Sequence, residues 1–580
     1  MSLSPSAGRT QPIYITELLS LIFSFLDDRS VSRAARVCQQ WSDIALDVLW
    51  HVVHDPRSLF SLLAPLNTYE QRTSSGTASI MKFRRPLMLS DWERFDRYAH
   101  RVRAVNFDCR RGKMRGRQLD QSVYDEMVRT CPRREIIPKL QTMTWYMNDA
   151  ARQSQSLVFM HGGIRHLSIQ LHKSANIRLE NYIDAVVSRA PGVTKLEIRS
   201  PHPVRDIRSE LLRLFGGLHQ LKHLAVPMFF LVDEVIAKLA SAIHLETINL
   251  AEPLEQGTGD RADVSFFSPN IEERGFSRLH TLSFSAHLQH ATMFLNRLFA
   301  PTHISSLHVN ILAIDNPPVL RQLLAAVTRF HRLTDLVLDF VLCPGAPIVT
   351  PPPPFARPSL EALRPLFSCR RIRKFEIRWD YQLHLSDHDM DDLARSWPEL
   401  EHLHLHSEPI PEAGTPSLTL RALLPFACHC PQLRYLALYL DGDAIPARTT
   451  SASPPAFRAL HKLALGSSPV TVVEPTALFL SQLCPVNCEI VSGVRWPDAF
   501  GIALEEAGVT DAQRIQMQDW WIRWGNIGKV LPLAVKARRE EKARIATLQL
   551  EMESLHMERN LEKERLEYLE REVRKLQGKR

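Results

Sequence analysis

The chain has 580 residues, which is enough for several domains or for one long array of repeats. Apolar residues make up 45% of it and charged residues 23%, as in an ordinary soluble globular protein. The net charge of +8 over this length indicates no nucleic-acid partner, and the absence of any run of eighteen apolar residues indicates no membrane span.

The beginning of the chain and its cysteines indicate the cellular compartment. The first eleven residues are polar and lack the apolar core of a secretory signal. Nine cysteines are sparse, odd in number and scattered, so free buried thiols are expected rather than disulfides. We therefore expect an intracellular protein, cytoplasmic and/or nuclear.

Residues 12–50 predict a compact group of helices with more apolar surface than it can bury alone. Five apolar residues recur at helical spacing in its first part: Leu18, Leu19, Ile22, Phe23 and Leu26. A second helical pattern follows an Asp-Asp and a serine, through Val31, Ala34, Val37, Trp41, Ala45 and Leu49. An independent core is marginal at this length, so a partner or the rest of the chain must cover these side chains.

The order of these residues resembles the F-box, the module by which substrate receptors attach to the Skp adaptor of cullin–RING ubiquitin ligases. The matching elements are Glu17-Leu18-Leu19, Ile22-Phe23-Ser24-Phe25-Leu26-Asp27, Val37-Cys38 with Trp41, and Leu49-Trp50. The family usually opens with Leu-Pro, where this chain has Tyr14-Ile15 and a displaced Pro12. The resemblance implies a Skp-type adaptor and, through it, a cullin as partners. It implies adaptor contacts at Ile15, Leu18, Leu19, Ile22, Phe23, Leu26, Val37 and Trp41. The alternative is an ordinary helical hairpin packed on its own domain.

A strand-like pattern of apolar, two any, apolar, one any, apolar returns from about residue 100 to 470, with helical stretches between its copies. The copies begin at Val102, Leu140, Ile164, Val193, Leu221, Leu245, Leu279, Ile304, Leu333, Ile372, Leu400, Leu433 and Leu460. A strand and a helix repeated at this period predict a leucine-rich repeat solenoid, and the sequence resembles the irregular repeats that commonly follow an F-box. A conventional α/β domain is the alternative.

Four segments between these patterns read as loops. Residues 68–80 predict a flexible link, and the proline-rich residues 344–358 predict a polyproline-like loop that is either a solvated insertion or a ligand for an aromatic-groove domain. A second polar loop lies near residue 450. The basic residues 110–117 read as a solvated loop or as a site for an acidic partner or phosphate.

The C-terminal part predicts helices. Two short helices carrying Trp520, Trp521 and Trp524 would cap the last repeat. A heptad frame then runs without a slip through Ile545, Leu548, Met552, Leu555, Arg559, Glu562, Leu566, Leu569, Val573 and Leu576. Because eight of these ten positions are apolar, we expect a coiled coil. A homodimer through residues 545–576, pairing with another coiled coil, and a lone helix remain open.

The predicted fold class is an α/β solenoid of irregular leucine-rich repeats with an N-terminal all-α F-box and a C-terminal coiled-coil helix. The predicted boundaries are 12–58 for the F-box, 59–99 for a linker or helical connection, 100–495 for the solenoid, 497–535 for a helical cap and 538–578 for the coiled coil.

No catalytic motif, cofactor site or metal site is predicted. Phosphate-binding loops, zinc-protease motifs and nucleophile elbows are absent from the sequence. Cys428-His429-Cys430 and Cys484 with Cys488 read as buried thiols rather than metal ligands. The carboxylates at 387–392 read as a helix N-terminus after Ser386, and His402, His404 and His406 read as one exposed strand face.

These features favour a non-enzymatic substrate receptor of an SCF ubiquitin ligase. The F-box would dock the adaptor and the repeats would bind a target protein that the sequence does not name. The alternative is a repeat and coiled-coil scaffold without a role in ubiquitin transfer.

Overall fold

The computed structural model describes residues 15–73, 76–109, 117–147, 149–174, 178–250, 259–272, 275–297, 303–312, 317–340, 352–410, 412, 414–446, 455–493 and 509–577. The chain forms two compact units. The first comprises Met1–Ala313, Arg329–Arg332 and Leu342–Pro344, and the second comprises Ile314–Thr328, Leu333–Val341 and Gly345–Arg580.

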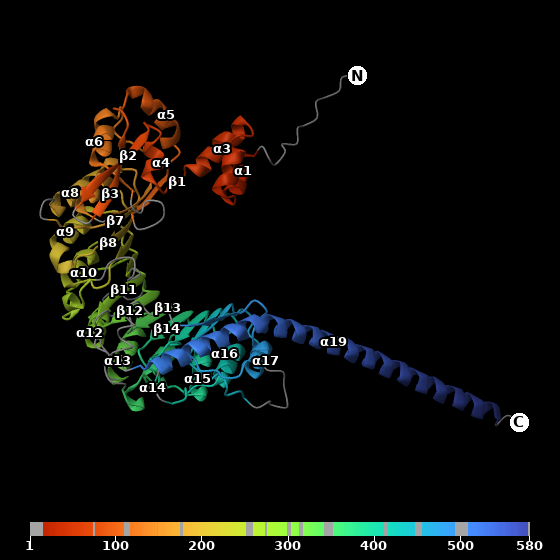
Figure 1. Ribbon diagram of the computed structural model, residues 1–580. Coiled ribbons are helices and arrows are strands. Elements are labelled where there is room, and N and C mark those ends of the chain that lie inside the picture. Colours follow the sequence, from red (N-terminus) through yellow and green to blue (C-terminus); the bar gives the residue numbers. More distant parts are fainter. Residues whose placement is uncertain are drawn as a thin grey trace, which may run out of the picture. The chain divides into compact units, whose positions relative to one another are not determined.

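The first unit begins with a trio of helices, α1 (Thr16–Ser24), α2 (Asp28–Ala34) and α3 (Gln39–Leu49) (Figure 1). Their shared core consists of Leu19, Phe23, Val31, Ala34, Ile44 and Ala45. Trp41 packs against this core, and its ring lies edge-on to Phe23 at a centroid distance of 5.4 Å. The helical prediction for this segment is confirmed.

Parallel strands follow the trio in the first unit. In sheet order they are β1 (Val52–Val53), β4 (Ala104–Asp108), β6 (Thr142–Tyr146), β7 (His166–Gln170), β8 (Lys195–Arg199), β9 (His223–Val226), β10 (Thr247–Leu250), β11 (Thr281–Ala286) and β12 (Ser306–Ile311). The α-helices between them are α4 (Pro56–Phe60), α5 (Leu89–Ala99), α6 (Gln121–Thr130), α7 (Ala150–Gln155), α8 (Leu179–Arg189), α9 (Val204–Gly217), α10 (Asp233–Ala240) and α12 (Leu288–Arg297).

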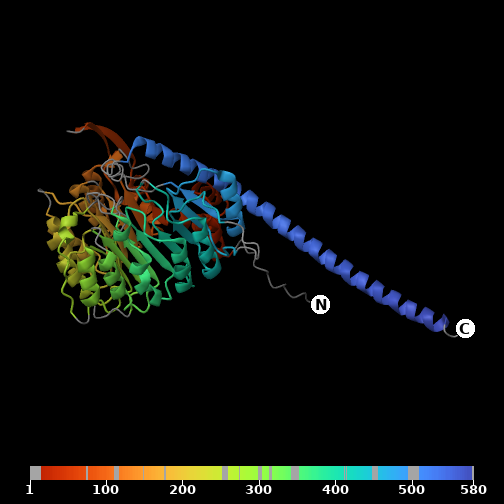
Figure 2. The same cartoon turned by 90° about the horizontal axis from the view of Figure 1, so that it is seen from below.

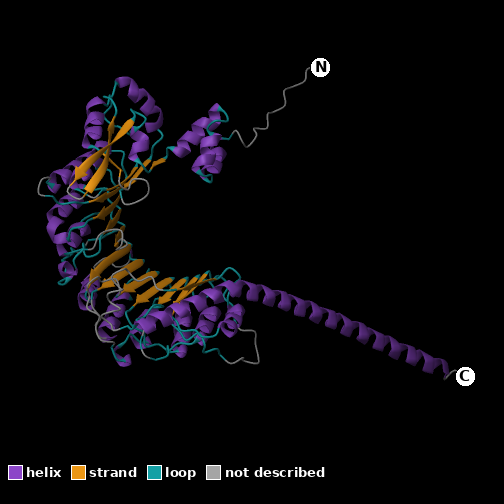
Figure 3. Ribbon diagram, viewed as in Figure 1, coloured by secondary structure: helices purple, strands orange, loops and turns teal. Residues whose placement is uncertain are grey.

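The second unit continues the same alternation. Its parallel strands are β13 (Asp335–Asp339), β14 (Lys374–Arg378), β15 (His402–Leu405), β16 (Tyr435–Leu438), β17 (Lys462–Gly466) and β18 (Glu489–Ser492). Its α-helices are α13 (Pro317–Val327), α14 (Leu360–Leu363), α15 (Asp387–Ser396), α16 (Leu423–His429), α17 (Val473–Leu483) and α19 (Asp511–Gln577). In each unit the strands form one layer and the helices between them form the other (Figure 3).

The repeated apolar positions stack from strand to strand and form the core. In the second unit Leu336, Phe375, Leu403, Leu436 and Leu463 lie in register on successive strands, and each is completely buried. Each strand therefore covers its neighbour's apolar side chains, and no single repeat buries its core alone. The predicted solenoid of strand-and-helix repeats is confirmed.

The flexible link expected at residues 68–80 is wrong. This segment forms an antiparallel hairpin of β2 (Leu66–Thr73) and β3 (Gly76–Phe83), and β5 (Arg117–Leu119) adds to it beside β3. The third strand comes from more than thirty residues further along the chain, so the local composition carries no sign of it. Backbone pairing on both sides of β3 satisfies hydrogen bonds that a solvated link would leave to water.

The expectation of two short helices around Trp520 is wrong for residues 511–533, which belong to one long helix, and the earlier residues 498–508 lie outside the described residues. The single helix α19 runs through Pro532 and extends well past the last repeat (Figure 2). Its first part packs on β18 and α17 and buries Trp524, Ile527, Leu531 and Val535 at helical spacing. Burial of four large side chains, each contributing about 1.5–3 kcal/mol, outweighs the roughly 3 kcal/mol cost of a proline inside a helix. Within the described residues, no helix is long and apolar enough to cross a membrane.

Candidate functional site

Helix α1 separates its apolar side chains into an inner and an outer set. Leu19 and Phe23 point into the core of the trio and are each 2% exposed. The outer set and one residue after α2 are exposed, and together they define the apolar face of the trio: Ile15, Leu18, Leu21, Ile22, Phe25, Leu26 and Val37. Phe25 alone is 81% exposed, which is rare for a large aromatic side chain unless a partner covers it.

The eight residues predicted to contact an adaptor therefore divide in two. Ile15, Leu18, Ile22, Leu26 and Val37 lie on the apolar face. Leu19 and Phe23 are buried in the trio's own core, and Trp41 packs half-buried against it. The second group supports the surface from within rather than forming it.

Sequence reasoning missed Leu21 and Phe25, which belong to the same face. Leu21 follows Leu18 by three residues, and Phe25 follows Leu21 by four, the spacing that places side chains on one side of a helix. The helical pattern contained this signal, but deciding which side of α1 faces inward requires the packing of α2 and α3.

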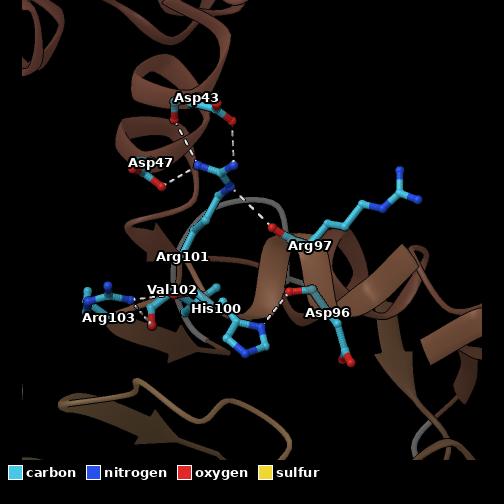
Figure 4. A network of polar contacts seen from close by, with 8 residues as sticks. All are labelled: Asp43, Asp47, Asp96, Arg97, His100, Arg101, Val102 and Arg103. Carbon is cyan, nitrogen blue, oxygen red and sulfur yellow. Dashed lines mark hydrogen bonds and ion pairs between the residues drawn. The ribbon is translucent and has the colours of Figure 1, made fainter. Parts of the chain in front are cut away.

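The trio is fastened to the first repeat by a network around Arg101 (Figure 4). One guanidinium nitrogen of Arg101 donates to the backbone oxygen of Asp43 at 2.9 Å and to a carboxylate oxygen of Asp47 at 2.5 Å. The other donates to the Asp43 carboxylate at 3.0 Å. Directly after α3, the His51 carbonyl accepts from the backbone N–H groups of Arg103 and Ala104, and β1 pairs with β4. The trio and the repeats are thus joined by backbone bonds as well as by charge.

A polar cluster lies on strands β14 and β15 of the second unit. The Glu376 carboxylate is almost fully buried and lies 2.9 Å from Lys374 Nζ, 3.0 Å from Arg378 Nη2 and 2.9 Å from His402 Nε2. The His402 ring stacks on Tyr435 of the next strand at 4.2 Å. Strand register brings these groups together, since residue 374 pairs with 402 and residue 402 with 435.

Electrostatics fix the protonation states in this cluster. Burial raises the pKa of the Glu376 carboxyl, but the hydrogen bond with His402 and the charges of Arg378 and Lys374 outweigh it and hold that pKa well below its usual range. Burial lowers the pKa of His404 to about 4, so this imidazole is neutral at pH 7. Burial and the nearby Asp339 raise the pKa of Asp380 to about 7. The cluster is a largely self-neutralised polar surface.

The exposed histidine face predicted for residues 402–406 is wrong, because none of the three side chains is exposed. His402 and His404 are half-buried on β15, whereas His406 is 5% exposed. The strand ends at Leu405, and His406 adopts φ of +41°, so the alternation of side chains stops one residue earlier. Burial also lowers the pKa of His406 well below its usual value.

A pocket of about 480 Å³ lies in the second unit between α19 and the loops that follow β15 to β17. Its lining includes Glu412, Tyr439, Asp441, Asp443 and Trp520. The Asp443 carboxylate already accepts from the backbone and hydroxyl of Thr471, and Glu412 pairs with Arg357 at 2.7 Å. Burial, with Glu412 and Asp441, raises the pKa of Tyr439 to about 12.

The carboxylates at 387–392 have the predicted structural role. Ser386 accepts from the backbone of Asp389, whose carboxylate accepts from the Ser386 backbone, which is a capping box at the start of α15. Cys430, Cys484 and Cys488 are buried free thiols, as predicted, but the prediction is wrong for Cys428, which is exposed. Among the described residues, no group of three or more His, Cys, Asp or Glu side chains could hold a metal ion.

Several predicted features fall wholly or partly outside the described residues. They are Pro12 and Tyr14, most of the basic segment 110–117, the first part of the proline-rich segment and most of the loop near residue 450.

Comparison with known proteins identifies the trio. Residues 16–55 match the F-box-like family, so the chain carries an F-box-like domain. No curated protein matches the sequence.

Two solved structures show a distant similarity. The Rad7–Elc1 complex from yeast is 15% identical, with a TM-score of 0.32, over 59% of this chain and 79% of that one. The leucine-rich repeat-containing protein LegL7 from Legionella pneumophila is 13% identical, with a TM-score of 0.25, over 43% and 79% of the two chains. At these scores neither carries an argument about this protein.

Proposed function

We propose that this protein is the substrate-recognition subunit of an SCF-type ubiquitin ligase. The observation that carries the proposal is the apolar face of the trio, which belongs to an F-box-like domain and is left uncovered by the described residues of its own unit. Contiguous apolar surface of this kind marks a protein-binding site. A Skp-type adaptor, with a cullin behind it, is the partner that the family implies.

The contribution of each residue follows from its position. Ile15, Leu18, Leu21, Ile22, Phe25, Leu26 and Val37 would lose water-exposed apolar area against the adaptor. Full burial of one such side chain is worth about 1.5–3 kcal/mol. Leu19, Phe23 and Trp41 hold α1 and α3 together so that this face stays in one arrangement. Aromatic residues dominate most interfaces, so Phe25 is the expected centre of the contact.

The repeats would hold the target protein, and the ligase chemistry would belong to a separate conjugating enzyme. This chain's role is then proximity, because a bound target presents its lysines at high effective concentration to that enzyme. The polar cluster on β14 and β15 and the pocket beside α19 are two polar features of the second unit that a target protein could contact. The cytoplasm or the nucleus is the proposed site of action.

The competing function is a scaffold that uses the repeats and coiled helix without ubiquitin transfer. Full-length chains carrying Ile22→Glu and Phe25→Glu discriminate the two, since both side chains are exposed and outside the trio's core. Leu478→Glu on α17, 58% exposed, is the matched control.

A receptor loses the co-purifying adaptor and cullin in the double variant, keeps them in the control, and lets its target accumulate. If the wild-type chain retains no adaptor or cullin, or if the double variant retains the same adaptor and the same target level, the receptor function is refuted.

A further inference from the structure

The second half of α19 presents an uncovered apolar row. Every residue from 539 to 571 is exposed, and the side chains of Ile545, Leu548, Met552, Leu555, Leu566, Leu569 and Val573 lie at alternating spacings of three and four along this part of the helix. At 1.5 Å per residue the row is about 42 Å long. A row of this spacing is covered when another helix packs along it.

Two charged residues interrupt the row at its centre. Arg559 occupies a heptad position equivalent to Ile545, and Glu562 occupies one equivalent to Leu548. The interruption decides which partner helix fits, because a charge on a packed seam requires an opposite charge facing it.

We propose that this row is the interface of an antiparallel dimer with a second copy of the chain. In an antiparallel pair centred between Asn560 and Leu561, Arg559 of each copy lies opposite Glu562 of the other. The same alignment places apolar positions opposite one another throughout: Leu555 with Leu566, Met552 with Leu569, Leu548 with Val573, and position 545 with position 576. The row is therefore complementary to itself only when reversed.

A parallel dimer forms favourable charge pairs at the edges of the helix interface but places like charges opposite one another at its centre. It places Arg559 against Arg559 and Glu562 against Glu562 on the seam, although it brings Glu558 near Lys563 and Arg565 near Glu570 at the edges. Exposed edge pairs contribute little, whereas like charges on a packed seam are strongly unfavourable. At its edges the antiparallel pair brings Glu558 near Arg565 but also Glu551 near Glu572, so the central Arg559–Glu562 layer decides the orientation. This inference is independent of the F-box proposal, since it rests on α19 alone.

Disulfide trapping of the full-length chain determines the orientation. Leu548→Cys and Val573→Cys chains are oxidised with a mild catalyst, separately and after mixing. The wild-type chain serves as background, because Cys38 and Cys428 are already exposed. Leu550→Cys and Leu561→Cys, which are more exposed than the test positions but lie off the row, are the controls.

If the dimer is antiparallel, oxidation of the mixed Leu548→Cys and Val573→Cys chains gives a disulfide-linked dimer. Oxidation of either chain alone then gives no more linked dimer than the wild-type chain does. A linked dimer from each chain alone would establish a parallel pair and overturn the proposal. A wild-type chain that sediments as a monomer at tens of micromolar would also overturn it.

Charge variants test the pairing of Arg559 with Glu562 at the centre of the row. Arg559→Glu places a second carboxylate opposite Glu562, so the dimer Kd rises by about ten- to a hundredfold, and adding Glu562→Arg restores it. Circular dichroism shows whether the helix content is retained. An Arg559→Glu chain with wild-type Kd contradicts the reversed alignment, because in a parallel pair the substitution only exchanges one like-charge contact for another.

Discussion

Phe23 and Phe25 provide a matched test of which side of α1 faces inward. They are the same residue type two positions apart, yet Phe23 is 2% exposed and Phe25 is 81% exposed. Replacing each with alanine removes the same atoms from opposite environments, Phe23 within α1 and Phe25 at the residue that ends it.

The expected magnitudes differ widely. Phe23→Ala removes a ring packed among Leu19, Val31 and the edge of Trp41, which costs about 3–5 kcal/mol. A unit of about forty residues is stable by only about 2–6 kcal/mol, so this loss unfolds the trio for much of the time. Phe25→Ala, on the surface, changes stability by less than about 0.5 kcal/mol.

Hydrogen exchange on peptides from residues 15–50 of the full-length chain measures both effects locally, without requiring the repeats to unfold. Phe23→Ala is predicted to bring these peptides close to the exchange rate of an unfolded chain, while Phe25→Ala leaves them protected and leaves repeat peptides unchanged. Equal loss of protection in the two variants would refute the inward and outward assignment of α1.

Three further perturbations follow from the geometry. Arg101→Ala removes the contacts to α3, and because the Asp43 and Asp47 carboxylates are largely exposed we expect at most about 1 kcal/mol of lost protection in α3 by hydrogen exchange, while β4 is unchanged. Glu376→Gln leaves its cationic neighbours without their buried counter-charge and costs about 1.5–3 kcal/mol at pH 7. Since the folded pKa of Glu376 is depressed, this stabilisation is present above its unfolded pKa of about 4.3 and is lost as pH falls below it. Hydrogen exchange in β14 should therefore differ between the wild type and the variant at pH 7, and the two rates should converge on acidification. A difference in exchange that does not depend on pH would contradict the ion-pair account. Gly466→Ala should destabilise β17 by well over the roughly 1–2 kcal/mol that a left-handed alanine costs, because its Cβ would lie 1.9 Å from the Ser407 carbonyl oxygen. Gly493 has φ of +96°, but a Cβ there meets no neighbouring atom, so Gly493→Ala should cost only the left-handed backbone conformation. Equal shifts of the thermal unfolding midpoint in the two variants would contradict this.

The features that the sequence predicts best are those set by short periods. The strand pattern and its spacing predict the repeats because each strand packs the same three apolar positions against its neighbours. The helices of the trio are predicted for the same reason. Neither pattern depends on residues far away in the chain.

The features that the sequence predicts poorly depend on contacts between residues far apart in the chain. The hairpin of β2 and β3 is completed by β5, and α19 continues through Pro532 only because Trp524 and Leu531 are buried on the last repeat. Leu21 and Phe25 escaped notice because the sides of α1 are assigned by α2 and α3. His406 turns inward through a backbone angle that strand alternation does not contain.

The central claim is that the apolar face of the trio binds a Skp-type adaptor, and titration calorimetry of the full-length chain with a purified adaptor tests it most directly. We predict a one-to-one complex with the wild-type chain and an affinity about ten- to a hundredfold weaker for Phe25→Ala, as loss of about 1.5–3 kcal/mol requires. A wild-type chain whose trio is protected from exchange but that binds no adaptor, or a Phe25→Ala chain with unchanged affinity, would contradict the account.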